Sequence, residues 1–257
     1  MRIIVSPTKR MKEDTDSFDC RALPQFLEKT QRIYIRLAQM SGEQLKQLWK
    51  CNDSIVLQNK ERLERMNLQE RLTPAILAYD GLQYQCLAPD VFTTQELEYV
   101  QQHLRILSGF YGILRPLDGV TPHHLAMKTK LEIDGKKNLY EFWGSSIAEK
   151  LFSETDCVIN LTSKEYSISV SRQMSKLRQQ NKISESASMI TCVFGKKMNG
   201  KIVQRESRND RDRAEMVRYL AEIQAENPEQ IKQFCRLGYH FSKEDSTDTK
   251  YVFLKEE

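Results

Sequence analysis

Glycine is scarce in this chain, and its scarcity limits the folds that the sequence can adopt. The 257 residues include 10 glycines and 7 prolines, which together are roughly half of what average usage gives a chain of this length. Folds that bind dinucleotides need glycines two residues apart in the turn that holds the phosphates, and no two glycines here have that spacing. The sequence therefore argues against the common nucleotide-binding folds.

One segment matches part of a second glycine motif. Residues 195–201, GKKMNGK, match the start of a phosphate-binding loop, but Ile202 stands where a Ser or Thr must hold magnesium. Asn199-Gly200 also lies between two apolar segments, which is typical of a β-hairpin turn. We therefore predict a hairpin here and no nucleotide cofactor.

The composition is that of a globular protein, with 40% hydrophobic and 29% charged residues. The N-terminus carries one short apolar run, Ile3–Val5, and no stretch is long enough to span a membrane. The six cysteines and four histidines show none of the spacings that are typical of zinc or redox sites. We therefore expect a cytoplasmic protein with reduced cysteines, no metal, no cofactor and no membrane partner.

The order of the predicted elements indicates a mixed α/β fold. Helical patterns dominate the first half, with capping boxes at Ser41 and Thr93, and strand-like apolar runs are more frequent in the second half. The predicted helices cover residues 25–40, 41–49, 54–66, 93–109, 139–151, 210–225 and 227–238. The predicted strands cover residues 2–6, 130–133, 157–161, 189–194, 201–204 and 250–254. No repeat or long linker divides the chain, so we predict a single domain, residues 1–257.

Positive charge is concentrated in one part of the sequence. The whole chain has a formal net charge of +4. Residues 161–205 hold nine basic and two acidic residues, a net +7, which leaves −3 for the rest. Clustered Lys and Arg displace counterions from phosphates, so the segment indicates an anionic partner. The other interpretation is a solvated hairpin face.

A second feature is the segment 103–118, HLRILSGFYGILRPLD. The helical spacing before it predicts a helix that ends at Gly109, and Gly112 begins the next stretch. A turn between two helices can offer its backbone amides to a phosphate group, and Arg105 and Arg115 could add charge. The alternative is that both glycines serve only as cap and turn residues.

Polar residues follow two of the predicted strands, where α/β folds often place reactive groups. These residues are Ser6, Lys9, Asn160, Ser163, Glu165 and Tyr166. Tyr111, Arg115 and Asp118 could join them. The set matches no established catalytic motif, but it could form the cleft of an enzyme that acts on a small anionic or nucleotide-like substrate.

Short motifs lie along nearly the whole chain. They are Ile4–Lys9 (IVSPTK), Ala75–Tyr84 (AILAYDGLQY), Gln101–Arg105 (QQHLR), Leu107–Asp118 (LSGFYGILRPLD), Asn138–Gly144 (NLYEFWG), Asn160–Tyr166 (NLTSKEY), Gly238–Phe241 (GYHF) and Val252-Phe253. In this order, the motifs together resemble those of the bacterial YaaA family of peroxide stress resistance proteins.

The resemblance implies a compact α/β domain of unusual architecture, with a mixed sheet, surrounding helices, a basic cleft and a helix-hairpin-helix-like element. It also implies binding of double-stranded DNA and a role in limiting free intracellular iron during hydrogen peroxide stress. On this basis we expect that the protein is not an enzyme. We also expect it to bind DNA through the phosphate backbone. The predicted interface consists of Lys9, Arg105, Gly109, Gly112, Arg115, Lys164 and Arg213.

The sequence departs from the family pattern in two segments. Residues 122–127 are PHHLAM where the family has P-Y-R-L-E-M, so His124 replaces an arginine and Ala126 replaces a glutamate. Residues 209–214 keep Arg213, but Ala214 replaces a glycine and the family's lysines are lost. Both departures bear on the charge of the expected cleft.

The DNA-binding and enzyme hypotheses differ in the geometry that they require. An enzyme needs Ser6, Lys9, Arg115, Ser163 and Glu165 to converge in a closed pocket. A protein that binds duplex DNA needs an open basic surface. The sequence alone leaves the oligomeric state open.

Overall fold

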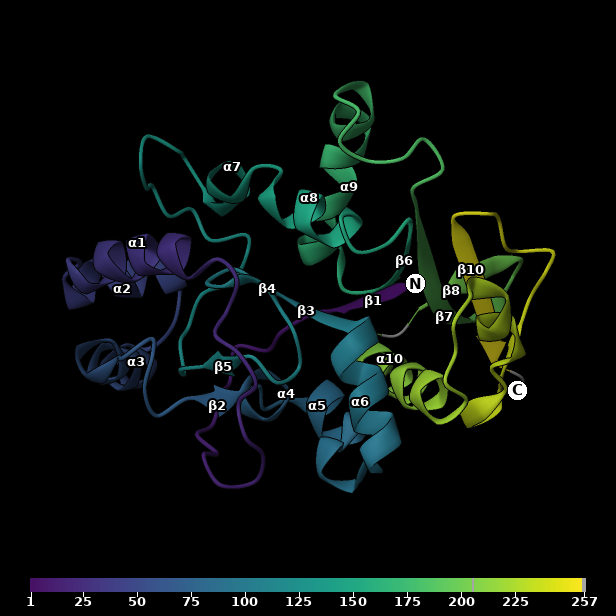
Figure 1. Ribbon diagram of the computed structural model, residues 1–257, viewed down its shortest axis with the longest axis horizontal. Helices are drawn as coiled ribbons and strands as arrows, with labels where there is room; N and C mark the ends of the chain where they lie inside the picture. Colours follow the sequence, from purple (N-terminus) through teal and green to yellow (C-terminus); the bar gives the residue numbers. More distant parts are fainter. Residues whose placement is uncertain (205, 256–257) are drawn as a thin grey trace.

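The computed structural model describes residues 1–204 and 206–255, and for residues 206–208 it describes the backbone alone. A mixed β-sheet runs through the middle of the molecule (Figure 1). Within the described residues this sheet has eight strands, in the order β4-β3-β1-β6-β7-β10-β9, with β8 paired to β7. Its strands are β1 (Arg2–Val5), β3 (Leu104–Ser108), β4 (Gly112–Leu114), β6 (Cys157–Leu161), β7 (Ser188–Met198), β8 (Lys201–Val203), β9 (Tyr239–Phe241) and β10 (Lys250–Lys255). A separate pair joins β2 (Thr73–Pro74) to β5 (Gly119–Val120).

The first strand of the chain lies inside the parallel part of this sheet, which has the order β3-β1-β6-β7-β10. β1 pairs in parallel with β3 on one side and with β6 on the other. Ile3, Ile4 and Val5 are at most 1% exposed, because a parallel strand is covered on both faces and needs an unbroken apolar run. The parallel pairs β6–β7 and β7–β10 extend the sheet, and the antiparallel pairs β3–β4, β7–β8 and β9–β10 complete it. The predicted mixed α/β fold is therefore confirmed.

Helices cover both sides of the sheet. Figure 1 shows α8 and α9 on one side of the central strands and α5, α6 and α10 on the other, while α1, α2 and α3 group at one end. The helices are α1 (Leu27–Ala38), α2 (Gly42–Trp49), α3 (Asp53–Arg65), α4 (Ala75–Ala78), α5 (Leu82–Leu87), α6 (Thr94–His103), α7 (Leu139–Trp143), α8 (Ser146–Phe152), α9 (Lys164–Gln179) and α10 (Glu206–Glu222). Short 3-10 turns are η1 (Pro89–Val91), η2 (Pro228–Gln233) and η3 (Arg236–Gly238). No helix in the described ranges combines the length and apolar sequence needed to cross a membrane.

Predictions that rest on local signals are confirmed. The capping boxes at Ser41 and Thr93 both form, each with the reciprocal side-chain and backbone hydrogen bonds. Asn199 and Gly200 have φ values of 49° and 73°, which are the left-handed conformations that a tight hairpin turn requires. They join β7 to β8, as predicted. All six cysteines are free.

Three other predictions are wrong or fall outside the described residues. The predicted strand 130–133 forms only an isolated bridge between Ile133 and Lys136. The predicted helix 227–238 consists of the 3-10 turns η2 and η3. Within η3, Leu237 has a left-handed backbone with a φ of 56°, which a continuous helix does not allow. Arg205, which contributes to the predicted basic segment, lies outside the described residues.

The most consequential error concerns the segment 103–118. Helix α6 ends at His103, and β3 follows at once as a fully buried strand. Gly109–Tyr111 then turns the chain into β4, which returns antiparallel to β3. The segment is therefore a β-hairpin and not a helix-hairpin-helix element, because pairing of β3 with β1 outweighs the helical spacing of its apolar residues.

The two glycines of this turn are required by close packing. A Cβ atom on Gly109 would lie 2.9 Å from the backbone of Leu125 and Ala126. Gly112 has a φ of +76°, and a Cβ atom there would lie 2.8 Å from the Trp143 ring. Trp143 in turn donates a hydrogen bond from Nε1 to the carbonyl of Gly109 at 3.0 Å. Both glycines thus belong to the core, which makes their amides unsuitable for a phosphate contact.

We predict that Gly112→Ala destabilises the protein more than Gly135→Ala does. Gly135 has a similar φ of +71° but has open space around the Cβ position. Gly135→Ala should therefore lose about 1 kcal/mol for its left-handed backbone, and Gly112→Ala about 2–4 kcal/mol because it also crowds Trp143. Urea unfolding measures both values. Equal losses at the two positions would contradict the packing role of Gly112.

Candidate functional site

The direction of the parallel strands separates the predicted site residues into two groups. Arg2 and Arg105 lie at or near the amino ends of β1 and β3, whereas Ser6 follows the carboxyl end of β1. The antiparallel strand β4 runs back along β3 and ends opposite Ile106, which carries Arg115 toward the amino end. Arg115 therefore lies at the opposite end of the sheet from Ser6, and the predicted convergence of these residues is wrong.

A buried carboxylate organises the amino end of the sheet. Glu154 Oε2 accepts hydrogen bonds from Arg105 Nε at 2.9 Å and Nη2 at 2.5 Å, and from Arg2 Nε at 3.1 Å. Its other oxygen lies 3.0 Å from Lys150 Nζ and 4.0 Å from Arg115 Nη2. The Arg105 side chain is only 4% exposed, so the prediction that it contacts DNA is wrong. It is an internal partner of Glu154.

Other residues of the predicted interface and of the predicted enzyme cleft are also dispersed. Asp118 is 5% exposed and accepts a hydrogen bond from the Arg115 amide at 2.8 Å. The Arg213 side chain, on α10, is 15% exposed and lies 3.9 Å from Asp210. Lys164, the first residue of α9, is exposed. The buried hydroxyl of Tyr111 accepts a hydrogen bond from the Thr121 amide. These residues do not form a common surface with the turn at Gly109.

At the carboxyl end, the predicted polar residues do come together, but they bind one another. Ser6 Oγ accepts a hydrogen bond from the Ser163 amide at 2.9 Å, which fastens the start of α9 to the end of β1. Glu165 accepts a hydrogen bond from the Lys128 amide at 3.2 Å and lies 3.4 Å from Lys128 Nζ. Tyr166, beside it, is 8% exposed. This network positions the segment that contains Lys128.

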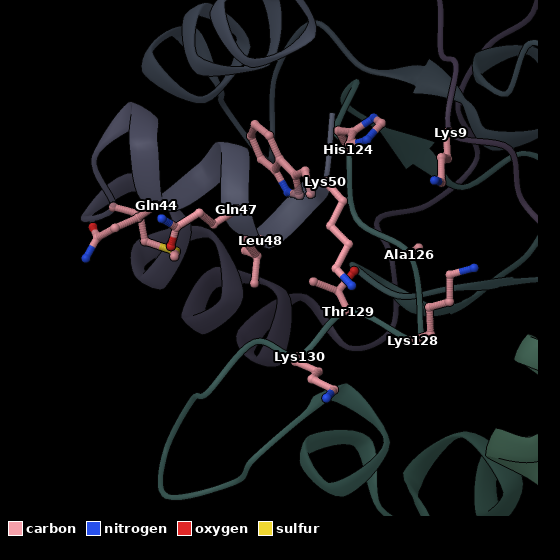
Figure 2. A pocket seen from close by; sticks show the side chains of 12 residues that line it. Lys9, Gln44, Gln47, Leu48, Lys50, His124, Ala126, Lys128, Thr129 and Lys130 are labelled. Atoms are coloured by element: carbon pink, nitrogen blue, oxygen red, sulfur yellow. The ribbon is translucent and has the colours of Figure 1, made fainter. Parts of the chain in front are cut away.

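A basic hollow lies beside α2 and that segment (Figure 2). It has a volume of about 610 Å³. Its lining residues are Lys9, Met40, Gln44, Gln47, Leu48, Trp49, Lys50, His124, Ala126, Lys128, Thr129 and Lys130. Figure 2 shows Lys50 extending from the end of α2 toward Thr129, with Lys128 and Lys130 on the opposite segment. We call this space the lysine hollow.

The charge of the lysine hollow is largely uncompensated. Its four lysines, Lys9, Lys50, Lys128 and Lys130, are all exposed, and no carboxylate is among the residues that line it. Lys128 pairs with Glu165, whereas the structure gives Lys9, Lys50 and Lys130 no ion pair within residues 1–204 and 206–255. Cations gathered in a concave surface raise the local concentration of anions.

A pair of helices ends beside the lysine hollow. Only residues 50–52 separate α2 from α3, and Lys50 makes the turn with a φ of 51°. Asn52 begins α3 by accepting a hydrogen bond from the Ile55 amide at 3.1 Å, and Asp53 is paired with Lys46 at 2.7 Å. The first amides of a helix lack intrahelical acceptors and favour phosphate groups. The lysine hollow therefore lies beside a pair of helices, α2 and α3, whereas the helical turn predicted within segment 103–118 does not form.

Two aromatic side chains form one wall of the lysine hollow. The rings of Trp49 and His124 meet edge to face, with centroids 5.5 Å apart. Burial, together with the charge of Lys9, lowers the pKa of His124, so its ring is neutral at pH 7. His124 and Ala126, which depart from the family pattern, both line the hollow. Ala214, the third departure, is buried in α10.

The sequence predicted parts of this site but not the hollow that they form together. The helices 41–49 and 54–66 and the break between them were predicted, but the sequence did not indicate that this turn lies beside a basic surface. Its left-handed residue is Lys50, at a position that glycine usually fills. Of the four lysines, Lys9 alone belongs to the interface predicted from the sequence. In the described part of the chain, no group of three or more His, Cys, Asp or Glu residues is placed to hold a metal ion.

Comparisons of the sequence with known proteins identify a family. The family model for peroxide stress protein YaaA matches residues 1–245. A UPF0246 protein from Lachnoclostridium phytofermentans is 44% identical over the whole of this chain and 97% of its own length. UPF0246 proteins from Pediococcus pentosaceus and Agathobacter rectalis are 43% and 45% identical, and the matches cover at least 98% of each chain.

Glu154 gives the stability of the protein a defined dependence on pH. Burial raises the pKa of its carboxyl, but the charge of Arg105 and the hydrogen bonds from Lys150, Arg2 and Arg105 outweigh this effect and lower the pKa from 4.5 to about 2. A lowered pKa in the folded state stabilises the protein above about pH 4.5, by up to about 3 kcal/mol, and this contribution is lost as the pH falls toward 2.

We therefore predict that Glu154→Gln lowers the free energy of unfolding at pH 7 by about 3–5 kcal/mol, because Arg105 loses its buried partner. The difference from the wild type should shrink as the pH falls from about 4.5 to about 2. Urea unfolding over a pH series measures it, with the exposed Glu132→Gln as the control. A difference that stays constant below pH 4.5 would contradict the role assigned to Glu154.

Proposed function

Because the chain belongs to the peroxide stress protein YaaA family, we propose that it acts in peroxide stress by binding double-stranded DNA. The lysine hollow and the helical hairpin beside it form the binding surface. The observation that carries the proposal is the presence of four lysines and no carboxylate in the lining of one hollow.

The proposed contacts are to phosphate groups rather than to bases in the duplex. Lys9, Lys50, Lys128 and Lys130 supply the charge, and Lys50 also belongs to the turn of the hairpin. Amides at the start of α3 add hydrogen bonds of the kind that helix N-termini give to phosphates. Phosphate contacts fix the position of a protein on a duplex but carry no sequence information, so we expect little sequence preference.

The same proposal includes a physiological effect, namely that the protein limits free intracellular iron during peroxide stress. The support for it is the association of the family with peroxide stress, because hydrogen peroxide damages DNA through its reaction with iron. A protein that covers DNA would protect it from that damage directly. We assign no residue of this chain to iron.

The geometry does not favour the alternative of an enzyme acting on a small anionic substrate. A nucleophilic hydroxyl needs a base within hydrogen-bond distance. Ser6 Oγ instead accepts a hydrogen bond from the Ser163 amide, and Glu165 is engaged with Lys128. Arg115, which that hypothesis places in the same closed pocket, lies at the other end of the sheet.

We predict a steep dependence of duplex binding on salt, which single substitutions in the hollow reduce. Each phosphate contact contributes about −0.9 to the slope of log K against log salt concentration. Lys9→Ala, Lys50→Ala and Lys130→Ala should each weaken binding and reduce the magnitude of this slope by about 1, equally for unrelated sequences. Fluorescence anisotropy with labelled duplexes over a salt series measures both quantities.

Lys243→Ala is the matched control for these variants. Lys243 is exposed in the loop between β9 and β10, which Figure 1 shows at the end of the molecule remote from α2. The Lys243→Ala substitution removes the same charge from the protein but should leave the slope of log K against log salt concentration unchanged. An equal effect of Lys243→Ala and Lys50→Ala, or an affinity that does not change with salt, would refute the proposed surface.

A further inference from the structure

We propose that the lysine hollow takes a single nucleotide whose base lies outside the double-helical stack. Its phosphate would lie against the lysines, and its base against Trp49 and His124. The inference rests on the proposed function, because the nucleotide would come from an unpaired or displaced position in the bound DNA. It goes beyond that function because contacts to the phosphates of an intact duplex do not involve the bases.

The size of the hollow is the first argument. Contacts to a duplex backbone need charged side chains on a surface, but they do not need a pocket. The hollow has a volume of about 610 Å³, which lies in the range of about 300–1,000 Å³ that is typical of pockets for small molecules. It therefore has room for a base and a sugar in addition to a phosphate.

The lining combines the two chemistries that a nucleotide needs. Lysines supply positive charge for the phosphate, while Trp49, Leu48 and Ala126 supply apolar surface for a base. Bases stack on aromatic side chains with little dependence on their identity, because every base has a π-face. An inorganic anion would use only the lysines and leave the apolar part of the lining unused.

The aromatic wall is neutral and fixed in place. Trp49 is 7% exposed and belongs to the buried face of α2. His124 meets it edge to face, and the lowered pKa of the imidazole leaves the ring uncharged at pH 7. A neutral imidazole beside an indole favours contact with a flat aromatic group over contact with a phosphate.

Hydrogen-bonding groups in the lining remain available for the edge of a base. Gln44 uses its side-chain oxygen in the capping box, where it accepts from the Ser41 amide. Gln47 is exposed on the same helix and lines the hollow, and the structure gives its side chain no hydrogen bond within the described ranges. An amide both donates and accepts, as the edge of adenine requires.

Three duplexes that carry the same number of phosphates test the inference. The first holds an adenine opposite an abasic analogue, the second holds the same adenine paired with thymine, and the third has abasic analogues on both strands at that position. Because the charges are equal, lysine contacts contribute equally to all three. We expect the first duplex to bind at least about tenfold more tightly than the other two.

Substitutions in the wall of the hollow separate base contacts from phosphate contacts. Gln47→Ala, His124→Ala and the conservative Trp49→Phe should each reduce the preference for the first duplex and leave the affinity for the paired duplex within about twofold. Lys130→Ala should weaken all three duplexes alike. Gln95→Ala, on the exposed part of α6 and outside the hollow and the helical hairpin, is the matched control and should change nothing.

The outcomes distinguish the inference from the proposed function. Equal affinity for the three duplexes, with the expected salt dependence, would overturn the inference and keep the proposed function. A preference that survives in all three wall variants would also overturn the inference. Failure of every duplex to bind, with calorimetric binding of free deoxyadenosine monophosphate but not of inorganic phosphate, would keep the nucleotide pocket and overturn the proposed function. No binding of any of these probes would overturn both.

Discussion

The parallel pairing of β1 with β3 and β6 determines where the functional side chains of this protein lie. It directs the arginines near the amino ends of these strands toward Glu154, and the polar residues after the carboxyl ends toward the start of α9. At the first end, Arg2, Arg105, Arg115 and Lys150 all lie within 4.0 Å of one buried carboxylate, Glu154. In the lysine hollow, only Lys128 has an ion pair among the described residues. Ion pairing, more than the number of basic residues, therefore distinguishes the structural end from the candidate binding end.

Local sequence signals predicted the elements that depend on local interactions. The capping boxes at Ser41 and Thr93 and the Asn199-Gly200 turn each involve residues within a few positions of one another, and all formed as predicted. The apolar runs that became β1 and β6 were also recognised, because strands buried on both faces leave a continuous hydrophobic signature. The fold class followed from these elements and their order.

Features that depend on distant contacts were not predictable in the same way. β3 has an apolar spacing that also fits a helix, and only its pairing with β1 selects the strand. The lysine hollow joins Lys9, the end of α2 and residues 124–130, which are far apart in the chain. The basic segment 161–205 was predicted to bind an anion instead, but its charges spread along α9 and the β7–β8 hairpin. Two of them are in ion pairs, Lys182 with Glu149 and Lys197 with Asp245. A count of charges along the sequence carries no information on such pairing.

The central claim is that DNA binds at the lysine hollow and the adjacent helical hairpin, and hydrogen–deuterium exchange with and without a duplex tests it most directly. The account predicts that DNA slows exchange at the turn between α2 and α3, residues 50–53, and along residues 126–130. It predicts no change at the β3–β4 turn, residues 109–112, whose glycines are enclosed by the core. Protection centred on residues 104–118 or on α10, with none at the hollow, would contradict the account.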